Sequence, residues 1–159
     1  MAIAVATTTK IQLAAAWTGT APGTASTPSG TLSSPSDISA YCTAVEVPFT
    51  VGTQDGTTFG SAGFTVKYAS LKDGSLSLTL LNDFAATYLD SIIWSTLGGL
   101  GATVYFDVMP TSAARGTSNP SYVGAVIITD YKPIPVSVGG LAAVSVTWPT
   151  TGAFARLTS

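Results

Sequence analysis

LKDGSLSLTLLNDFAATYLDSIIW, residues 71–94, is the stretch that decides the fold class. Within it, residues 75–81 alternate between hydroxyl and leucine side chains, which predicts a strand with one polar and one buried face. The pattern then changes to a helical period, because Phe84, Tyr88 and Ile92 recur at every fourth position. A strand followed by an amphipathic helix predicts a sheet with a helix packed against it.

The predicted helix spans residues 83–97. Asn82 is suited to the N-cap position, and Asp83 is suited to the positive end of the helix dipole. The Gly98–Gly99 pair is expected to end the helix. The residues that flank its aromatic stripe are Leu89, Ile93 and Leu97. This apolar face is expected to pack against a sheet rather than to hold a cofactor.

The other apolar segments predict strands. Lys72-Asp73-Gly74 is a turn signal, and Pro48 favours an edge position or a bend in its strand. The expected strands cover residues 10–15, 38–51, 64–70, 75–81, 102–109, 122–131, 142–148 and 154–157. The sequence therefore predicts a mainly β fold, a β-sandwich or small barrel of about seven to eight strands with one flanking α-helix.

We expect residues 1–159 to form a single domain with two long irregular segments. Residues 18–36, TGTAPGTASTPSGTLSSPS, cannot bury enough apolar surface to order themselves alone. They are predicted to form a flexible arm or loop that another surface holds. The candidate contact residues of this arm are Thr18, Pro22, Pro28 and Pro35.

Residues 50–64 are predicted to form a second long, Gly-rich loop. Its lone aromatic residue, Phe59, favours a docking role for the loop tip. The segments GTQDG (52–56) and GSAG (60–63) are rich in glycine but are not phosphate loops, because no Lys-Ser/Thr pair and no helix follow them.

Charge is scarce throughout the chain. Only 9% of the residues are charged, against about 25% in an ordinary soluble domain. The mean hydropathy is +0.43, the formal net charge is −2 and the pI is about 4.6. A free monomer with so few charges is poorly protected against association, so the composition favours a subunit that hides its surface against other copies. The chain has no basic stripe, so tight nucleic-acid binding is not expected.

The N-terminal segment has no basic region, and the apolar runs are far shorter than about 20 residues. We therefore expect neither a signal peptide nor a membrane span. Cys42 is the only cysteine, which excludes an intrachain disulfide. With no histidine to activate it, Cys42 is expected to be a small buried hydrophobe rather than a catalytic thiol.

Enzymatic activity is not expected. The sequence has no histidine, so a Ser-His-Asp relay and a histidine-based metal site are excluded. A hydrolase built on paired carboxylates stays open, and its sign would be an apolar pocket that holds two acids. The acids are Asp37, Glu46, Asp55, Asp73, Asp83, Asp90, Asp107 and Asp130. Most lie in turns, at a helix cap or on polar strand faces, so we predict no catalytic, cofactor-binding or metal-binding residues.

Five segments together resemble a known family. They are DISAYCTAVEVP (37–48), TTFGSAG (57–63), LKDGSLSLTLLNDFAATYLDSIIW (71–94), NPSYVGAVIITDY (119–131) and VGGLAAVSVTWPTTG (138–152). Their order and spacing resemble the major tail tube protein of long, non-contractile-tailed bacteriophages, especially those that infect actinobacteria. The resemblance covers nearly the whole chain from Asp37 onward. The chain departs from the family after Gly139-Gly140, where members of the family commonly have a carboxylate.

This resemblance implies a β-sandwich with one helix, related to the tube protein of the type VI secretion system. Subunits of the family close into six-fold rings, and the rings stack into a hollow tube through which the genome passes. Strands pair around the ring into a continuous inner barrel, and a long loop reaches the next ring. The inter-ring loop candidates are Thr50, Gly52, Asp55, Phe59, Gly63 and Phe64.

The partners implied by the resemblance are other copies of the chain and the tail tip or initiator, tape measure and terminator proteins. Double-stranded DNA would pass through the tube without tight binding. The protein would be made in the host cytoplasm and reside in the virion tail.

Asp107 and Asp130 are candidates for acids that face the channel, although an ordinary solvated position on an outer face explains them equally well. The alternative function is a monomeric immunoglobulin-like binding module or a capsid decoration module, which the strand count allows. The predicted helix and the long loop weigh against this alternative.

Overall fold

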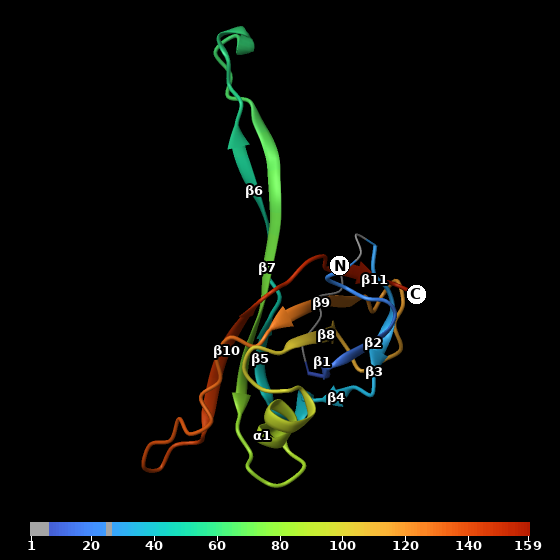
Figure 1. Ribbon diagram of the computed structural model, residues 1–159, viewed down its shortest axis with the longest axis vertical. Coiled ribbons are helices and arrows are strands. Elements are labelled where there is room, and N and C mark those ends of the chain that lie inside the picture. The colour runs from blue at the N-terminus through green and yellow to red at the C-terminus, as the bar shows by residue number, and fades with distance from the viewer. Residues whose placement is uncertain (1–6, 25–26) are drawn as a thin grey trace.

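Two packed antiparallel sheets form the body of the protein, and a long hairpin projects from it (Figure 1). The computed structural model describes residues 7–24 and 27–159. The strands are β1 Lys10–Ala14, β2 Ala16–Thr20, β3 Ser29–Ser33, β4 Ser36–Asp37, β5 Cys42–Glu46, β6 Phe49–Asp55, β7 Lys67–Leu81, β8 Thr103–Met109, β9 Ser121–Ile127, β10 Ala143–Pro149 and β11 Ala155–Leu157. The helical segments are η1 Ser39–Tyr41, η2 Phe59–Ser61, α1 Leu89–Ser91 and η3 Ile92–Thr96. The mainly β, sandwich-like fold with one short α-helix confirms the predicted fold class.

The larger sheet has the strand order β11-β9-β8-β1-β4, and the smaller one has the order β10-β7-β5. Strand β6 pairs with the outer half of β7, and β2 and β3 form a separate two-stranded hairpin. All of these strand pairs are antiparallel. A bridge between Val126 and Thr150 joins the two main sheets beyond the end of β10.

The core lies between the two main sheets. The leucines of β7 at the even positions 76, 78 and 80 are fully buried, which confirms the predicted two-faced strand at residues 75–81. Every second residue of β10 is buried as well, and the indole Nε1 of Trp148 donates a hydrogen bond to the carbonyl of Asp130 at 2.8 Å. The sequence pattern of period two therefore identified this half of the core correctly. The residues concerned are Leu76, Leu78, Leu80, Val144, Val146 and Trp148.

The predicted turn at Lys72-Asp73-Gly74 is wrong, because β7 runs without a break through these residues. Strand β6 lies beside them, with Thr50 opposite Asp73 and Phe49 opposite Gly74. The Asp73 carboxylate accepts a hydrogen bond from the Gly74 amide at 2.8 Å, and the chain direction does not reverse. The ladder to β6 supplies the backbone partners of this segment, so pairing overrides the local turn preference.

The single strand predicted over residues 38–51 is divided in the structure. It consists of η1, β5 and the start of β6, and the break between β5 and β6 falls at Pro48. This confirms the bend that proline predicted. Val45, Val47 and Phe49 pack against the core, but Val51 is exposed because it lies beyond the body, on the projecting hairpin.

The predicted helix is shorter than expected. Only α1 and the π-helical turn η3 are helical, whereas residues 82–88 are not. Asn82 does not cap a helix: its side-chain amide donates to the carbonyl of Pro133 at 2.7 Å, and its Oδ1 accepts a hydrogen bond from the Tyr131 hydroxyl at 2.9 Å. These contacts with a distant segment draw Asn82 away from the cap position.

The buried face of this segment also differs from the prediction. Phe84 and Tyr88 are exposed, whereas Leu89, Ile93 and Leu97 are buried. The flanking residues, and not the aromatic stripe, therefore meet the core. The wide turn at η3 keeps the three buried residues on one side with a spacing of four. Within the described part of the chain, no helix is long and apolar enough to span a membrane.

Candidate assembly surfaces

The smaller sheet ends in two open edges. β5 forms one edge over five residues and β10 forms the other over seven. The larger sheet instead ends in β11 and β4, which are only three and two residues long. Short edge strands protect a sheet against pairing with other chains, whereas longer open edges permit it. The smaller sheet is therefore the one that another chain can extend by adding a strand.

The outer face of the smaller sheet is lined with hydroxyl groups. Ser77 Oγ lies 3.0 Å from Thr147 Oγ1 on the neighbouring strand, and Thr79 Oγ1 lies 3.4 Å from Ser145 Oγ. Glu46 is the only charged residue in β5, β10 and the 75–81 part of β7. This face is hydrophilic and nearly neutral, so it can lie against water or a polyanion without binding the latter tightly.

The hairpin of β6 and β7 carries the predicted inter-ring loop and projects away from the body (Figure 1). The prediction of a loop over residues 50–64 is wrong in part, because residues 49–55 belong to β6. The hydroxyl of Thr50 donates a hydrogen bond to the carbonyl of Asp73 at 3.4 Å. Gly52 lies at an irregularity in the register between Val51 and Thr53.

The tip of the hairpin, residues 56–66, is held by its own polar groups. The Asp55 carboxylate accepts hydrogen bonds from Thr57, which lowers the pKa of Asp55 below its usual range. Ser61 forms reciprocal capping contacts with Thr58, and a left-handed turn follows, with Gly63 at φ +85°. This frame holds the side chains of two aromatic residues, Phe59 and Phe64, in solvent.

Apolar residues along the shaft of the hairpin form an exposed row that was not predicted from the sequence. Val51, Tyr68 and Leu71 are all exposed there. Val51 lies in the strand predicted over residues 38–51 and Tyr68 in the one predicted over residues 64–70, whereas Leu71 lies between that strand and the predicted turn. Only the long pairing of β6 with β7 places them outside the core.

The predicted flexible arm is a hairpin of this subunit. Thr18 lies in β2 opposite Thr31 of β3, and the Trp17 ring lies 6.0 Å from that of Tyr105 in β8. Pro22 and Pro28 are buried, whereas Pro35 is exposed. Packing onto the larger sheet supplies apolar contacts that residues 18–36 lack by themselves. The described residues of the predicted arm form a hairpin with β2 and β3, whereas the flexibility of the arm stays a prediction. Residues 25 and 26 lie outside the described part.

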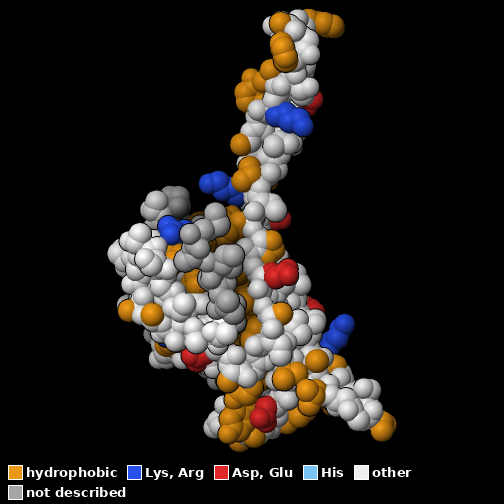
Figure 2. All heavy atoms as spheres, turned by 180° about the vertical axis from the view of Figure 1, so that it is seen from behind, with side chains coloured by type: hydrophobic (Ala, Val, Ile, Leu, Met, Phe, Trp, Pro, Cys, Tyr) orange, Lys and Arg blue, Asp and Glu red, His pale blue; other side chains and the backbone are white. Residues whose placement is uncertain are grey.

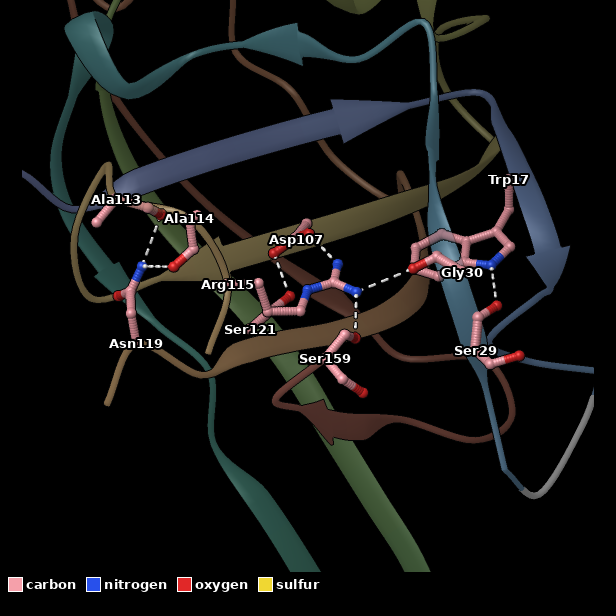
Figure 3. A network of polar contacts seen from close by, with 10 residues as sticks. All are labelled: Trp17, Ser29, Gly30, Asp107, Ala113, Ala114, Arg115, Asn119, Ser121 and Ser159. Atoms are coloured by element: carbon pink, nitrogen blue, oxygen red, sulfur yellow. Dashed lines mark hydrogen bonds and ion pairs between the residues drawn. The ribbon is translucent and has the colours of Figure 1, made fainter. Parts of the chain in front are cut away.

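A cluster around Arg115 fastens this hairpin to the body (Figure 3). The guanidinium donates hydrogen bonds to Asp107 Oδ2 at 3.0 Å, to the carbonyl of Gly30 at 3.0 Å and to the carbonyl of Ser159 at 3.4 Å. The Ser121 hydroxyl donates a hydrogen bond to the other carboxylate oxygen of Asp107, Oδ1. The cluster therefore joins β3, β8, β9 and the last residue of the chain.

The position of Asp107 contradicts its candidacy as a channel-facing acid. Its exposed fraction is 4%, and its carboxylate is paired with Arg115. The β2–β3 hairpin covers the face of β8 that the sequence pattern left open. Asp130 is partly exposed, and its carboxylate accepts a hydrogen bond from Thr129 at 3.5 Å, so its role stays a prediction.

The shallow depressions of the described surface are where the paired carboxylates of a hydrolase would be expected. Five of them, of about 240 to 500 Å³, are each lined by a single acidic residue. Among residues 7–24 and 27–159, no cluster of acidic residues and cysteine has metal-binding geometry. Cys42 is half-buried, its thiol donates to the carbonyl of Ala44, and burial raises its pKa.

The sequence matches no model of a known protein family and no curated relative. The fold, however, is shared with a chain of a solved structure described as the virion of a native gene transfer agent particle. The TM-score is 0.55, and the two sequences are 20% identical. The alignment covers 77% of this chain and 88% of that chain. This likeness shows a common fold.

Proposed function

We propose that this protein is a structural, non-enzymatic subunit of a phage-like virion and forms its tail tube. The observation that carries the proposal is the pair of open edges on the smaller sheet, β5 and β10, beside a projecting hairpin. A chain with only 9% charged residues is suited to burial between copies. The fold shared with a chain of a virion particle supports the same assignment.

Ring closure would occur by pairing of β5 with β10 of the next copy. A contact between two different surfaces of the same chain generates a ring when its rotation closes, and the resemblance implies six subunits. The smaller sheets would then form one continuous barrel. The larger sheet would lie outside, where the circumference is greater, and the hydroxyl-lined face would line the channel.

Stacking of the rings would build a hollow tube. The β6–β7 hairpin, with Thr50, Gly52, Asp55, Phe59, Gly63 and Phe64, is the proposed contact with the next ring. The further partners are the tail tip or initiator, tape measure and terminator proteins. Double-stranded DNA would pass along the neutral channel face without tight binding. The subunit would be made in the host cytoplasm and reside in the tail of the virion.

Negative-stain electron microscopy of the purified protein at low and high concentration tests this function. Stacked rings or hollow tubes are the expected result. Compact single particles at every concentration, also after addition of a tail initiator complex, would overturn the proposal. That outcome would favour the alternative, a monomeric immunoglobulin-like binding module or a capsid decoration module.

A further inference from the structure

An exposed apolar surface covers the end of the molecule opposite the hairpin tip. Figure 2 shows hydrophobic side chains gathered at this lower end and again at the tip. We call the surface at the lower end the base patch. Its residues are Phe84, Tyr88, Trp94, Leu100, Ile134, Val136, Val138 and Leu141, and all of them are exposed. So many apolar side chains in one region of a monomer indicate an interaction surface.

Two separate segments, residues 84–100 and 134–141, contribute the exposed residues of the base patch. Asn82 joins them at both ends of the second segment: its backbone amide donates to the carbonyl of Ala142 at 2.7 Å, and its side chain donates to that of Pro133. The rings of Trp94 and Tyr131 pack edge to face at a centroid distance of 6.4 Å. The Tyr131 hydroxyl oxygen also lies 3.2 Å from Asp90 Oδ1, so its single proton is shared between Asn82 and Asp90.

The tip and the base patch match in chemistry. Residues 56–66 of the tip contain no charged side chain, and neither do residues 133–142 of the base patch. Phe59 at the tip and Val138 at the base are both fully exposed. The tip and the 133–142 segment can therefore be joined without desolvating a charge of either segment, which would be costly.

A subunit cannot bring its own two surfaces together. The shaft of the hairpin is paired from Lys67 to Gly74, which gives a stiff extension of about 25 Å at 3.3 Å per residue. It points away from the base patch along the longest axis of the molecule (Figure 1). Within the described chain, the aromatic side chains of the tip remain in solvent, so only a second molecule could cover them.

We infer that the base patch receives the hairpin tip of a second copy of this chain. The contact is head to tail, so each copy uses both surfaces and the interaction repeats along an axis. Phe59 and Phe64 are the anchors, and the polar frame of Thr58 and Ser61 holds them ready before contact. The inference rests on the proposed function only in identifying this axis with the tube axis.

Proximity of the two surfaces can be measured by crosslinking. In a Cys42→Ser background, Phe59→Cys and Val138→Cys are placed on separate subunits, which are mixed, allowed to assemble and treated with a short bis-maleimide. A crosslinked dimer is expected in the mixture and not in either preparation alone. The matched control replaces Val138→Cys with Thr103→Cys, an exposed position at the start of β8, and should give no dimer.

The energetic coupling between the tip and the base patch can be measured by introducing charged residues at positions 59 and 138. Phe59→Asp is expected to raise the concentration needed for assembly at least tenfold, whereas Thr65→Asp, an exposed polar position of the same tip, should leave it within twofold. Val138→Lys introduced into the Phe59→Asp chain should restore at least part of the loss, because opposite charges then meet between copies.

The outcomes separate this inference from the proposed function. The inference would be overturned if normal tubes formed without a crosslink between positions 59 and 138 and if F59D assembled at the same concentration as T65D. The proposed function would remain supported in that case. A crosslink without rings or tubes would support the contact and overturn the tube. Absence of both would overturn both. A base patch that instead binds a different virion protein would appear as a loss of virion incorporation in V138K with unchanged tubes, and it too would overturn the inference.

Discussion

At the scale of single residues, the Asp107–Arg115 pair is the most consequential polar contact. The Asp107 side chain is buried, and the Arg115 side chain is largely buried where it contacts Gly30 of the β2–β3 hairpin and Ser159. A buried ion pair that loses one partner leaves an uncompensated charge, and the desolvation of that charge exceeds the loss of the hydrogen bonds alone. The pair is therefore expected to hold residues 16–33 in place.

Arg115→Ala is predicted to destabilise the fold by about 3 kcal/mol, because it leaves the Asp107 carboxylate buried and unpaired. Urea denaturation measures the loss, and hydrogen exchange should show faster exchange in β2 and β3. The double variant Arg115→Met with Asp107→Leu should recover most of the stability. A single variant with wild-type stability would show that the cluster is not structural.

Because of the Tyr131 hydroxyl, the free energy of unfolding is expected to depend on pH in the alkaline range. Burial raises the pKa of Tyr131 well above 10, and the nearby Asp90 carboxylate raises it further. Because the folded-state pKa exceeds the unfolded one, this contribution is fully present below about pH 10 and decreases as pH rises above it. Tyr131→Phe should lower stability at pH 8 and lose less stability than the wild type between pH 9.5 and 11. Parallel urea titrations of both proteins would reveal equal slopes if the tyrosine were not involved.

At the scale of elements, β7 is decided by its partner and not by its local sequence. The Lys72-Asp73-Gly74 triplet favours a turn, yet β6 pairs with it in register. Likewise, the strand expected at 38–51 divides at Pro48 because β5 and β6 pair with successive parts of β7. The ladder determines where the strands begin and end.

Asp73→Thr distinguishes the strand from the predicted turn. Thr is common in strands and Asp is not, and Asp73 is exposed, so stability should change by no more than about 0.5 kcal/mol. Gly74→Val should be clearly destabilising, since a Cβ at Gly74 would lie 2.9 Å from Phe49 Cδ1 and 3.0 Å from the Pro48 carbonyl. Thermal unfolding followed by circular dichroism measures both. A large loss in D73T would restore the turn interpretation.

The open edges of β5 and β10 give a second prediction at this scale. Ala44 and Ser145 are exposed on the hydroxyl-lined face, each opposite Thr79. The double variant Ala44→Lys, Ser145→Lys should remain folded but fail to form rings, because like charges would meet where β5 joins the next copy. Electron microscopy and unfolding of the same samples check this.

Matched variants make that test specific. Ala44→Glu combined with Ser145→Lys should recover ring formation, since opposite charges then meet at the same joint. Thr103→Lys, on an exposed position of the larger sheet, should assemble normally. Rings that form equally well in the double-lysine variant would exclude edge pairing through this face.

At the scale of the whole molecule, the structure shows which surfaces lack charged residues. The outer face of the smaller sheet is nearly neutral, and the tip and residues 133–142 of the base patch lack charges. Asp130 is the remaining candidate for a channel-facing acid. Asp130→Asn is predicted to slow DNA release from particles without preventing tube assembly, because less repulsion would keep DNA from the wall. Release assays with matched tube counts measure this, and loss of assembly would show that Asp130 is structural.

Much of the sandwich was accessible from the sequence alone. Side chains in a strand alternate with period two, so the leucines at 76, 78 and 80 and the apolar residues of β10 identified core strands correctly. The shortage of charge also predicts burial between copies, and this stays a prediction. Both inferences depend on local pattern and composition, which a single sequence contains completely.

What only the tertiary structure decided is which local preferences prevail. Pairing with β6 extended β7 through a turn signal, and contacts with the 131–133 segment drew Asn82 away from a helix cap. Packing on β8 placed the predicted arm of small polar residues against the larger sheet and buried Asp107. Each outcome depends on residues distant in the sequence, whose combined contacts outweigh propensities of a few tenths of a kcal/mol to about 1 kcal/mol per residue. For the same reason, the base patch became visible only when Asn82 brought its two segments together.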